Sequence, residues 1–360
     1  MKKYYRLYLD VKNRILSGEL KQGDRLNSKR TEADKRGVSV ITVEKAYAIL
    51  EDEGYIESRK RSGYFVSATE TIIPPGLRKT PEIKKLPLPK PAGERHFQYS
   101  LWFKTVRKVI AEQGELLFLK APPEGCAVLR NAISEYLLSY RGLSAQPDRI
   151  IIGSGAEQLY ENIIKLMGRD KIYGIEDPSY GKIRAVYKGN GAEVLPLALC
   201  GDGIDSRLLN EKEFDVLHVT PFHSFPSGIS TSISKRCEYL RWAEKRSSFI
   251  IEDDYDSEFF MPGQPTETLF SLDRNQSVIY INTFSKSLSP SMRIGYMILP
   301  EKLIPLYKEK LGVFSCSVPV MDQYVLAEFI SSGNFVRHLN HVRRNLKKIH
   351  KSQKSLFPPL

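Results

Sequence analysis

Six of the chain's prolines fall between residues 72 and 95, and no other feature limits the fold as strongly. Proline fixes φ and lacks a backbone N–H, so this segment is unsuited to a helix or to the interior of a sheet. With its lysines and arginines it is typical of a semi-rigid, basic linker. Because one core rarely extends beyond about 250–300 residues, we predict two domains, over 1–67 and 96–360, joined by a linker over 68–95.

Positive charge is concentrated near the start of the chain. The formal net charge is +12, and two-thirds of the excess of lysine and arginine lies before residue 96. This balance favours a polyanionic partner such as nucleic acid. The sequence has no 18-residue apolar run and no secretory signal, so we expect a cytoplasmic protein with no membrane partner. The four cysteines are scattered and have no nearby histidine, which predicts no metal site.

Residues 1–67 show three helical patterns followed by a hairpin pattern. Ser28 and Ser39 are suited to cap the second and third helices. Two short strands, 55–58 and 63–66, flank a basic tip at 59–62. Apolar residues recur at helical spacing, with Leu7, Val11 and Ile15 in the first helix and Val43, Ala46, Tyr47 and Leu50 in the third.

This arrangement is suited to reading DNA. A recognition helix needs a capped start, an apolar face against its own domain, and polar side chains on its first exposed turns. The third helix has these features, and the hairpin tip is placed to enter a minor groove. The pattern also fits a protein-interaction module with a solvated charged loop. The predicted DNA contacts are Arg30, Ser39, Thr42 and Lys45 on the helices and Arg59, Lys60, Arg61 and Gly63 in the hairpin.

A long series of spaced residues in this segment forms one pattern: Tyr5, Tyr8, Ile15, Gly18, Leu20, Gly23, Leu26, Ser28, Arg30, Gly37, Val38, Ser39, Thr42, Val43, Ala46, Tyr47, Leu50, Glu53, Gly54, Tyr55 and Ile56. The pattern resembles the GntR family of regulators over its whole length. That resemblance implies a winged helix-turn-helix that binds a double-stranded DNA operator.

Beyond the linker, apolar β-rich runs alternate with helical stretches. This rhythm predicts an α/β domain with a mixed, mostly parallel sheet. The runs cover residues 150–152, 171–175, 216–219, 249–251, 278–281 and 294–299.

Several polar residues follow these runs, at the sheet edge where open α/β folds bind ligands. Lys286 follows one run, and Asp253 follows another within an acidic segment, 252–256. A glycine-rich turn at 153–155 leads into a helix, whose first backbone N–H groups are suited to an anion. Taken singly, a lysine is usually a surface residue, and the acidic segment also fits a loop or a hard-metal site.

Together these groups meet the needs of pyridoxal 5′-phosphate (PLP), which requires an amine, an acid, an anion site and a flat wall. Lys286 would supply the amine for a Schiff base, and Asp253 would keep the pyridine nitrogen protonated. The other predicted contacts are Gly155, Ala156, Glu157, Ser285 and Arg293 for the phosphate, Tyr180 for the ring wall and Tyr255 for the phenolic oxygen.

Three runs, 219–228, 252–258 and 285–290, stand in an order and spacing that resemble the fold-type-I aminotransferases, and specifically the MocR branch of the GntR regulators. The resemblance extends from about residue 96 to the chain end. It implies a PLP-dependent transferase fold (fold type I) and a head-to-tail homodimer with DNA-binding domains on flexible linkers. The chain ends soon after Lys286, so we expect most of the C-terminal small subdomain, with its substrate-carboxylate arginine, to be missing.

These expectations combine into a PLP-dependent transcriptional regulator. An amino acid or related amine would displace Lys286 from the internal aldimine, and the altered dimer would reposition its winged helices on the operator. Two alternatives stay open: a PLP-dependent aminotransferase with an accessory DNA-binding domain, and a truncated remnant that binds DNA alone. The missing carboxylate arginine favours a sensor over an enzyme and leaves residual transamination open.

Overall fold

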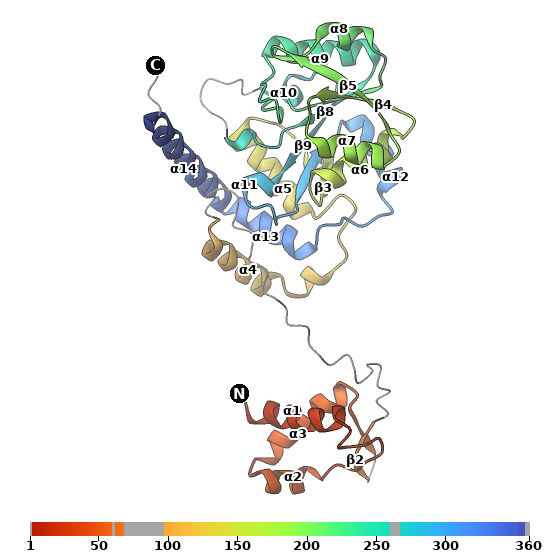
Figure 1. The fold of residues 1–360 in the computed structure, drawn as a ribbon, viewed down its shortest axis with the longest axis vertical. Coiled ribbons are helices and arrows are strands. Elements are labelled where there is room, and N and C mark those ends of the chain that lie inside the picture. The colour runs from red at the N-terminus through yellow and green to blue at the C-terminus, as the bar shows by residue number, and fades with distance from the viewer. Residues whose placement is uncertain (1, 60–61, 68–96, 260–266, 357–360) are drawn as a thin grey trace. The chain divides into compact units, whose positions relative to one another are not determined.

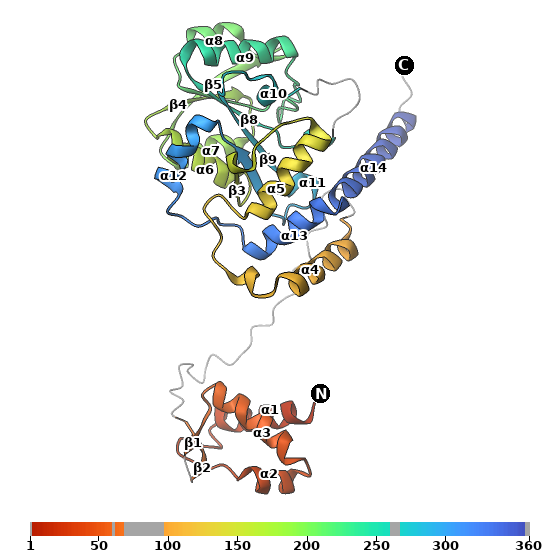
Figure 2. The ribbon, with the colours of Figure 1, turned by 180° about the vertical axis from the view of Figure 1, so that it is seen from behind.

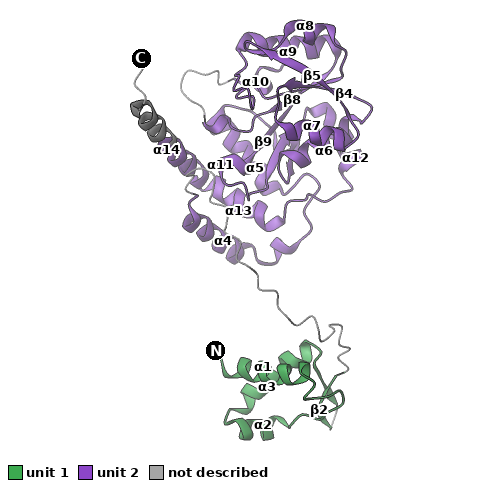
Figure 3. Ribbon diagram, in the orientation of Figure 1, with its two compact units in different colours: residues 1–92 green, residues 93–360 purple. Residues whose placement is uncertain are grey.

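The computed structural model describes residues 2–59, 62–67, 97–259 and 267–356. It divides into two compact units, residues 1–92 and 93–360 (Figure 3), and each is described by itself. The linker predicted over 68–95 lies outside the described residues. None of the described helices has both the length and the apolar character needed to cross a membrane.

The first unit has the predicted three helices and hairpin. Ser28 accepts a hydrogen bond from the Thr31 N–H and Ser39 accepts one from the Thr42 N–H, so both predicted caps are confirmed. The apolar faces of the first and third helices form one core, in which each buried side chain contributes about 1.5–3 kcal/mol. The elements are α1 (Lys3–Leu16), α2 (Lys29–Arg36), α3 (Val40–Asp52), β1 (Ile56–Arg59) and β2 (Gly63–Val66).

The hairpin differs from the prediction in one respect. Arg59 is the last residue of β1, paired with Gly63, and is not part of the hairpin tip. Gly63 has φ +105°, which lets the chain turn tightly enough for pairing to continue to Arg59. The Arg59 guanidinium lies 2.6 Å from the Glu57 carboxylate and 4.6 Å from the centre of the Phe65 ring. Lys60 and Arg61 lie outside the described residues.

The second unit is built on an eight-stranded sheet in the order β3-β10-β9-β8-β7-β4-β5-β6 (Figure 1). The central pairs from β5 to β9 are parallel, whereas β10 runs antiparallel to both of its neighbours and β6 runs antiparallel to β5. The mixed, mostly parallel sheet is therefore confirmed. The strands are β3 (Ile150–Gly153), β4 (Ile172–Asp177), β5 (Glu193–Cys200), β6 (Gly203–Ile204), β7 (Val216–Val219), β8 (Phe249–Asp253), β9 (Val278–Thr283) and β10 (Gly295–Ile298).

Helices cover both faces of this sheet, so the residues of its central strands are buried at nearly every position. Ile150 and Ile152 face one helical layer, and Ile151, between them, faces the other. Among the helices, α6 and α7 lie in front of the sheet in Figure 1 and α5 lies in front of it in Figure 2. The helices are α4 (Tyr99–Gln113), α5 (Ala127–Tyr136), α6 (Ala156–Met167), α7 (Gly181–Gly189), α8 (Ser206–Glu211), α9 (Ile233–Arg246), α10 (Leu269–Leu272), α11 (Phe284–Ser287), α12 (Ile304–Leu311), α13 (Val320–Ser331) and α14 (Asn334–Leu356).

The sequence analysis does not predict β5 and β6. The β5 strand contains Pro196, and Leu197 is its one buried residue, so it lacks the continuous apolar run of the central strands. The β6 strand is only two residues long. The β6 strand is at the edge of the sheet and β5 is next to it, where the burial that makes a strand recognisable is weakest.

The strand directions bring one set of chain segments together. Because β10 is antiparallel to both β3 and β9, those two strands point the same way as β8, β7 and β4. The carboxyl ends of these five strands and the start of β10 therefore share one edge. Open α/β sheets bind ligands at this edge.

Candidate cofactor site

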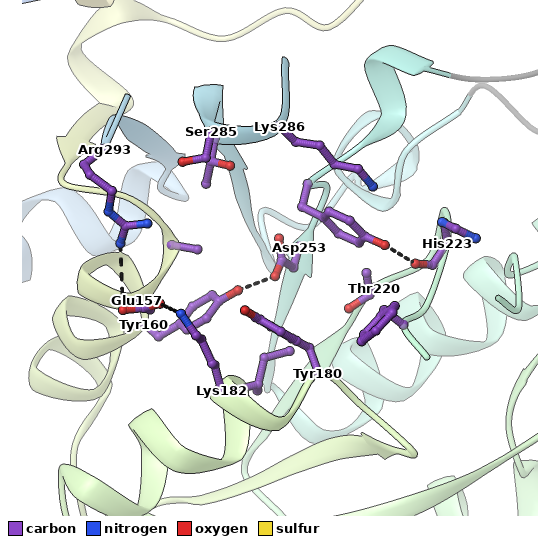
Figure 4. Close-up of a pocket in the computed structure, with 15 residues that line it drawn as sticks. Glu157, Tyr160, Tyr180, Lys182, Thr220, His223, Asp253, Ser285, Lys286 and Arg293 are labelled. Atoms are coloured by element: carbon purple, nitrogen blue, oxygen red, sulfur yellow. Dashed lines mark hydrogen bonds and ion pairs between the residues drawn. The ribbon is translucent and has the colours of Figure 1, made fainter. Parts of the chain in front are cut away.

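A cavity of about 560 Å³ opens at this shared edge. Figure 4 shows Lys286 and Arg293 on opposite sides of it, with Asp253 between them. The cavity brings together eight of the nine predicted cofactor residues, and the ninth, Gly155, lies against Arg293. Its lining residues are Ala156, Glu157, Tyr160, Tyr180, Lys182, Ile183, Thr220, His223, Phe225, Asp253, Tyr255, Thr283, Ser285, Lys286 and Arg293.

Asp253 forms the floor of the cavity. It ends β8 and is only 4% exposed, and its Oδ2 atom accepts a hydrogen bond from the Tyr160 hydroxyl. Burial, with the Asp253 carboxylate beside it, raises the pKa of Tyr160 well above its ordinary value, so this phenol stays a donor. The Oδ1 atom of Asp253 has no hydrogen-bond partner among the described residues. A buried carboxylate oxygen left unpaired is costly, and a protonated ring nitrogen would satisfy it.

A histidine behind Asp253 extends this polar floor. His218 Nε2 lies 3.9 Å from Asp253 Oδ2, and its Nδ1 lies 2.9 Å from the Tyr187 hydroxyl. His218 and Tyr187 are both buried. The sequence analysis does not single out these two residues or Tyr160. The one available signal was a histidine inside the apolar run that forms β7.

Lys286 lies on the four-residue helix α11, directly after β9. Its Nζ atom is 2.5 Å from Asp256 Oδ2 and 4.3 Å from the centre of the Tyr255 ring. The Tyr255 hydroxyl donates to the backbone carbonyl of His223 at 2.8 Å. Tyr255, which is predicted to bond the phenolic oxygen of PLP, thus lines the cavity, and its hydroxyl group bonds a neighbouring loop.

The opposite end of the cavity is suited to an anion. Gly155 has φ +94°, a backbone conformation that favours glycine, and a Cβ atom there would lie 3.0 Å from the Arg293 guanidinium. The helix α6 begins at Ala156, so its free backbone N–H groups face this end. Glu157 lies 2.6 Å from the Lys182 ammonium and 3.8 Å from Arg293. The Lys182 hydrogen bond lowers the pKa of Glu157, which therefore stays ionised.

Two further residues complete the comparison with the prediction. Ser285 is at the cavity, where its hydroxyl donates to the Met292 carbonyl at 3.1 Å. Tyr180 is 43% exposed at the mouth, with its ring centre 6.1 Å from that of Phe225. Lys182 was missed because it lies on the next helix, α7, and approaches the anion end only through the fold. An amine, a buried acid, an anion site and an aromatic wall thus meet in one cavity, which fits PLP.

The exposed surface of α3 forms a second candidate site. Lys45 on α3 and Arg30 on α2 are exposed, and the hydroxyls of Ser39 and Thr42 lie 2.9 Å apart at the start of α3. The sequence analysis does not single out Ile41, which is 65% exposed on the first turn. This turn therefore presents both hydroxyl groups and an apolar side chain to solvent.

Comparisons with known proteins match two separate parts of the chain to two families. Residues 3–66 match the bacterial regulatory proteins of the gntR family, and residues 92–360 match aminotransferase class I and II. The HTH-type transcriptional regulator YdeL of Bacillus subtilis (strain 168) is 34% identical, over 96% of this chain and 77% of YdeL. The probable rhizopine catabolism regulatory protein MocR of Rhizobium meliloti is 29% identical, over 94% of this chain and 73% of MocR.

The chain belongs to the MocR-like subfamily of GntR regulators. As a MocR-like protein, it is a transcriptional regulator that joins a DNA-binding winged helix to an aminotransferase-like domain. The α-aminoadipate aminotransferase LysN of Thermus thermophilus has the same fold, with 27% identity and a TM-score of 0.61. That match covers 69% of this chain and 64% of LysN. The family implies PLP as the cofactor of the MocR-like protein.

A buried glutamate beneath the cavity gives a test by pH. Glu176, on β4, accepts hydrogen bonds from the Thr220 N–H at 3.2 Å and the Ser224 hydroxyl at 2.6 Å. Burial raises the pKa of Glu176 to about 7. The folded state thus keeps a proton that the unfolded state releases near pH 4.5, so this group lowers the free energy of unfolding as the pH rises from about 4.5 to about 7.

We expect Glu176→Gln to remove this part of the pH dependence, on the order of 3 kcal/mol between those two pH values. Urea unfolding at several pH values measures it. Burial also raises the pKa values of Glu252 and Glu258, so these two residues account for the pH dependence of stability that remains in the variant. The control is Glu213→Gln, at a side chain that is 88% exposed. A slope in Glu176→Gln equal to that of the wild type would show that Glu176 is ionised throughout.

Proposed function

We propose that the protein is a PLP-dependent regulator that binds an operator and responds to an amino acid or a related amine. The observation that carries this proposal is the cavity in which Lys286, Asp253 and Arg293 converge, on the same chain as a winged helix. When bound, PLP supplies an aldehyde that reacts reversibly with primary amines. Because such a regulator acts on chromosomal DNA, we place the protein in the cytoplasm.

Each residue of the cavity then has a distinct task. Asp253, fixed by Tyr160, holds the proton on the ring nitrogen, and Arg293 with the start of α6 binds the phosphate. Tyr180 covers the ring, and Lys286 supplies the amine that an effector replaces. An amino-group effector is supported by LysN, whose structure is described as complexed with N-(5'-phosphopyridoxyl)-L-leucine.

The second candidate function is a working aminotransferase, because solved structures with this fold include aminotransferases. The two functions differ in outcome, since a sensor binds an amine and an enzyme also turns it over. The same preparation can test both.

The experiment loads the full chain with PLP and selects a duplex that it binds from a randomised DNA library. Proteinogenic amino acids and simple amines are then screened for a change in visible absorbance. At least one that changes the absorbance should change the Kd for the duplex by about 5- to 150-fold. Repeated turnover with an added keto acid, without any change in Kd, would establish the enzyme instead. If PLP gives no visible band, the chain is a DNA-binding remnant.

We also propose a homodimer. Exposed apolar side chains gather on two neighbouring segments that a hydrogen bond from the Cys316 N–H to the Pro122 carbonyl joins at 3.3 Å. Phe118 is 89% exposed and Val313 is 75% exposed. Clusters of this kind are typical of protein interfaces. A head-to-tail dimer would cover these side chains. A mass of 41.1 kDa in sedimentation equilibrium, which is that of a single chain, would contradict the dimer.

The DNA contacts follow from the exposed face of α3. We propose that Arg30, Ser39, Thr42 and Lys45 contact the duplex from the helices, and that Gly63 and the hairpin residues 59–61 contact it from the wing. Of the hairpin residues, Arg59 and Gly63 are described, and Arg59 lies beside Glu57.

Lys45→Ala should weaken binding to every duplex by a similar factor, because a phosphate contact carries no base information. The slope of log K against log salt concentration should fall by about 1. Fluorescence anisotropy at several salt concentrations measures both. Lys165→Ala, at an exposed position in the other unit, is the control. Loss of affinity for the selected duplex alone would show that Lys45 reads a base.

A further inference from the structure

One residue in direct contact with the Lys286 ammonium is not among the predicted cofactor residues. Asp256 lies three positions after Asp253, and its Oδ2 atom is 2.5 Å from Lys286 Nζ. The side chains are 13% exposed for Asp256 and 31% exposed for Lys286. The pair is therefore partly shielded from water, and a charge-assisted hydrogen bond of this length is a strong one.

Neighbouring groups hold Asp256 in this place. The same Oδ2 atom lies 3.2 Å from His223 Nδ1, on the loop after β7. The backbone carbonyl of His223 accepts the hydrogen bond from the Tyr255 hydroxyl, and the Tyr255 ring lies 4.3 Å from the Lys286 ammonium. Two loops that follow adjacent strands thus form a receptacle for one ammonium group, with a carboxylate on one side and an aromatic face on another.

An effector that replaces Lys286 creates a single new ammonium group in the cavity. The C=N bond from the PLP aldehyde carbon to Lys286 breaks as a C=N bond to the effector nitrogen forms. The protons that the effector ammonium loses end on Lys286, so charge and atoms balance without any oxidant or reductant. Any group that stabilises the Lys286 ammonium therefore favours the state in which the effector has replaced Lys286 on PLP.

We propose that Asp256 is a positioning residue that receives the ammonium of Lys286 and sets how much amine is needed to displace it. This inference rests on the proposed function and deepens it, because it assigns the sensitivity of the response to one carboxylate. Asp256 acts through Lys286 and through no contact with the effector.

The test uses the full chain loaded with PLP and methylamine as the probe. Borohydride fixes PLP on whichever amine holds it, and the intact mass gives the fraction still carried by the protein. We expect Asp256→Asn to raise the methylamine concentration at half displacement about ten-fold or more. Asp256→Glu, which keeps the charge, should recover part of that change. Asp177→Asn, at a half-exposed carboxylate paired with Arg184, is the matched control.

The possible outcomes separate the two proposals. An unchanged midpoint in Asp256→Asn, with normal displacement in the wild type, overturns the role of Asp256 and leaves the proposed function standing. A wild type that carries no PLP on Lys286, or that methylamine does not displace, overturns both. If Asp256→Asn does not load PLP, Asp256→Ser removes the same charge with a smaller side chain, and its midpoint decides the question. If Asp256→Asn and Asp256→Ser both fail to bind PLP while Asp256→Glu binds it normally, the charge of Asp256 is needed for PLP binding itself. That result would contradict a role limited to the displacement of Lys286.

Discussion

Lys286→Ala is expected to abolish the covalent adduct that PLP and borohydride form with the wild-type chain. The alanine has no amine, and the aldehyde of PLP requires one at this end of the cavity. The visible band near ~420 nm, which an amine-bound PLP gives, should disappear with it. Peptide mass spectrometry after borohydride measures the adduct and places it in the chain.

A second lysine in the same cavity provides the control. Lys182 also lines it, but its ammonium lies 2.6 Å from Glu157 at the anion end. Lys182→Ala should keep the adduct on Lys286, with a weaker affinity for PLP because one cation near the phosphate is lost. An adduct that persists at full yield in Lys286→Ala would refute the assignment of the amine.

Arg141→Met should destabilise the aminotransferase-like unit by about 3–5 kcal/mol, because it leaves buried carboxylates without their cation. Arg141 ends a single π-helical turn, Leu137–Arg141. Its guanidinium lies 3.1 Å from Asp254 and 3.8 Å from Glu258, and all three side chains are nearly or fully buried. Each of these two carboxylates also has an oxygen that lacks a hydrogen-bond partner within the described residues.

Urea unfolding, followed by near-ultraviolet circular dichroism, measures the loss. The loss should be smaller at pH 5.5 than at pH 8, because burial raises the pKa of Glu258 to about 7 and its protonated form needs no cation. Arg207→Ala, at a side chain that is 81% exposed beside Asp205, should leave the stability almost unchanged, because a surface ion pair contributes little. Adding Asp254→Asn and Glu258→Gln to Arg141→Met should restore much of the stability. No recovery in that triple variant would show that Arg141 stabilises the fold by packing.

Features fixed by short stretches of sequence were predictable. The caps Ser28 and Ser39, the buried strands and the placement of Lys286 and Asp253 after strands all follow from local patterns. Polar groups inside an apolar run were not predictable, because a residue such as His218 becomes part of the site only when β7 lies beside β8.

Contacts between residues on separate elements of the fold could not be predicted from the sequence either. Lys182 and Tyr160 come from helices on one side of the sheet, and their nearness to Glu157 and Asp253 is a property of helix packing. The β5 strand, next to the edge of the sheet, has too few buried residues to be recognised from its sequence. Sequence therefore predicted the groups that we propose bind PLP, and the structure showed which neighbouring groups position them.

The connection between β9 and β10 carries both Lys286 and Arg293. It is closed on itself by a hydrogen bond from the Phe284 N–H to the Ile294 carbonyl at 2.9 Å and by the Ser285 bond to Met292. If Lys286 and Arg293 hold the two ends of PLP as proposed, one closed connection sets the spacing between those two contacts. A substitution elsewhere in the cavity wall would then leave the spacing between Lys286 and Arg293 unchanged, because this connection holds both residues.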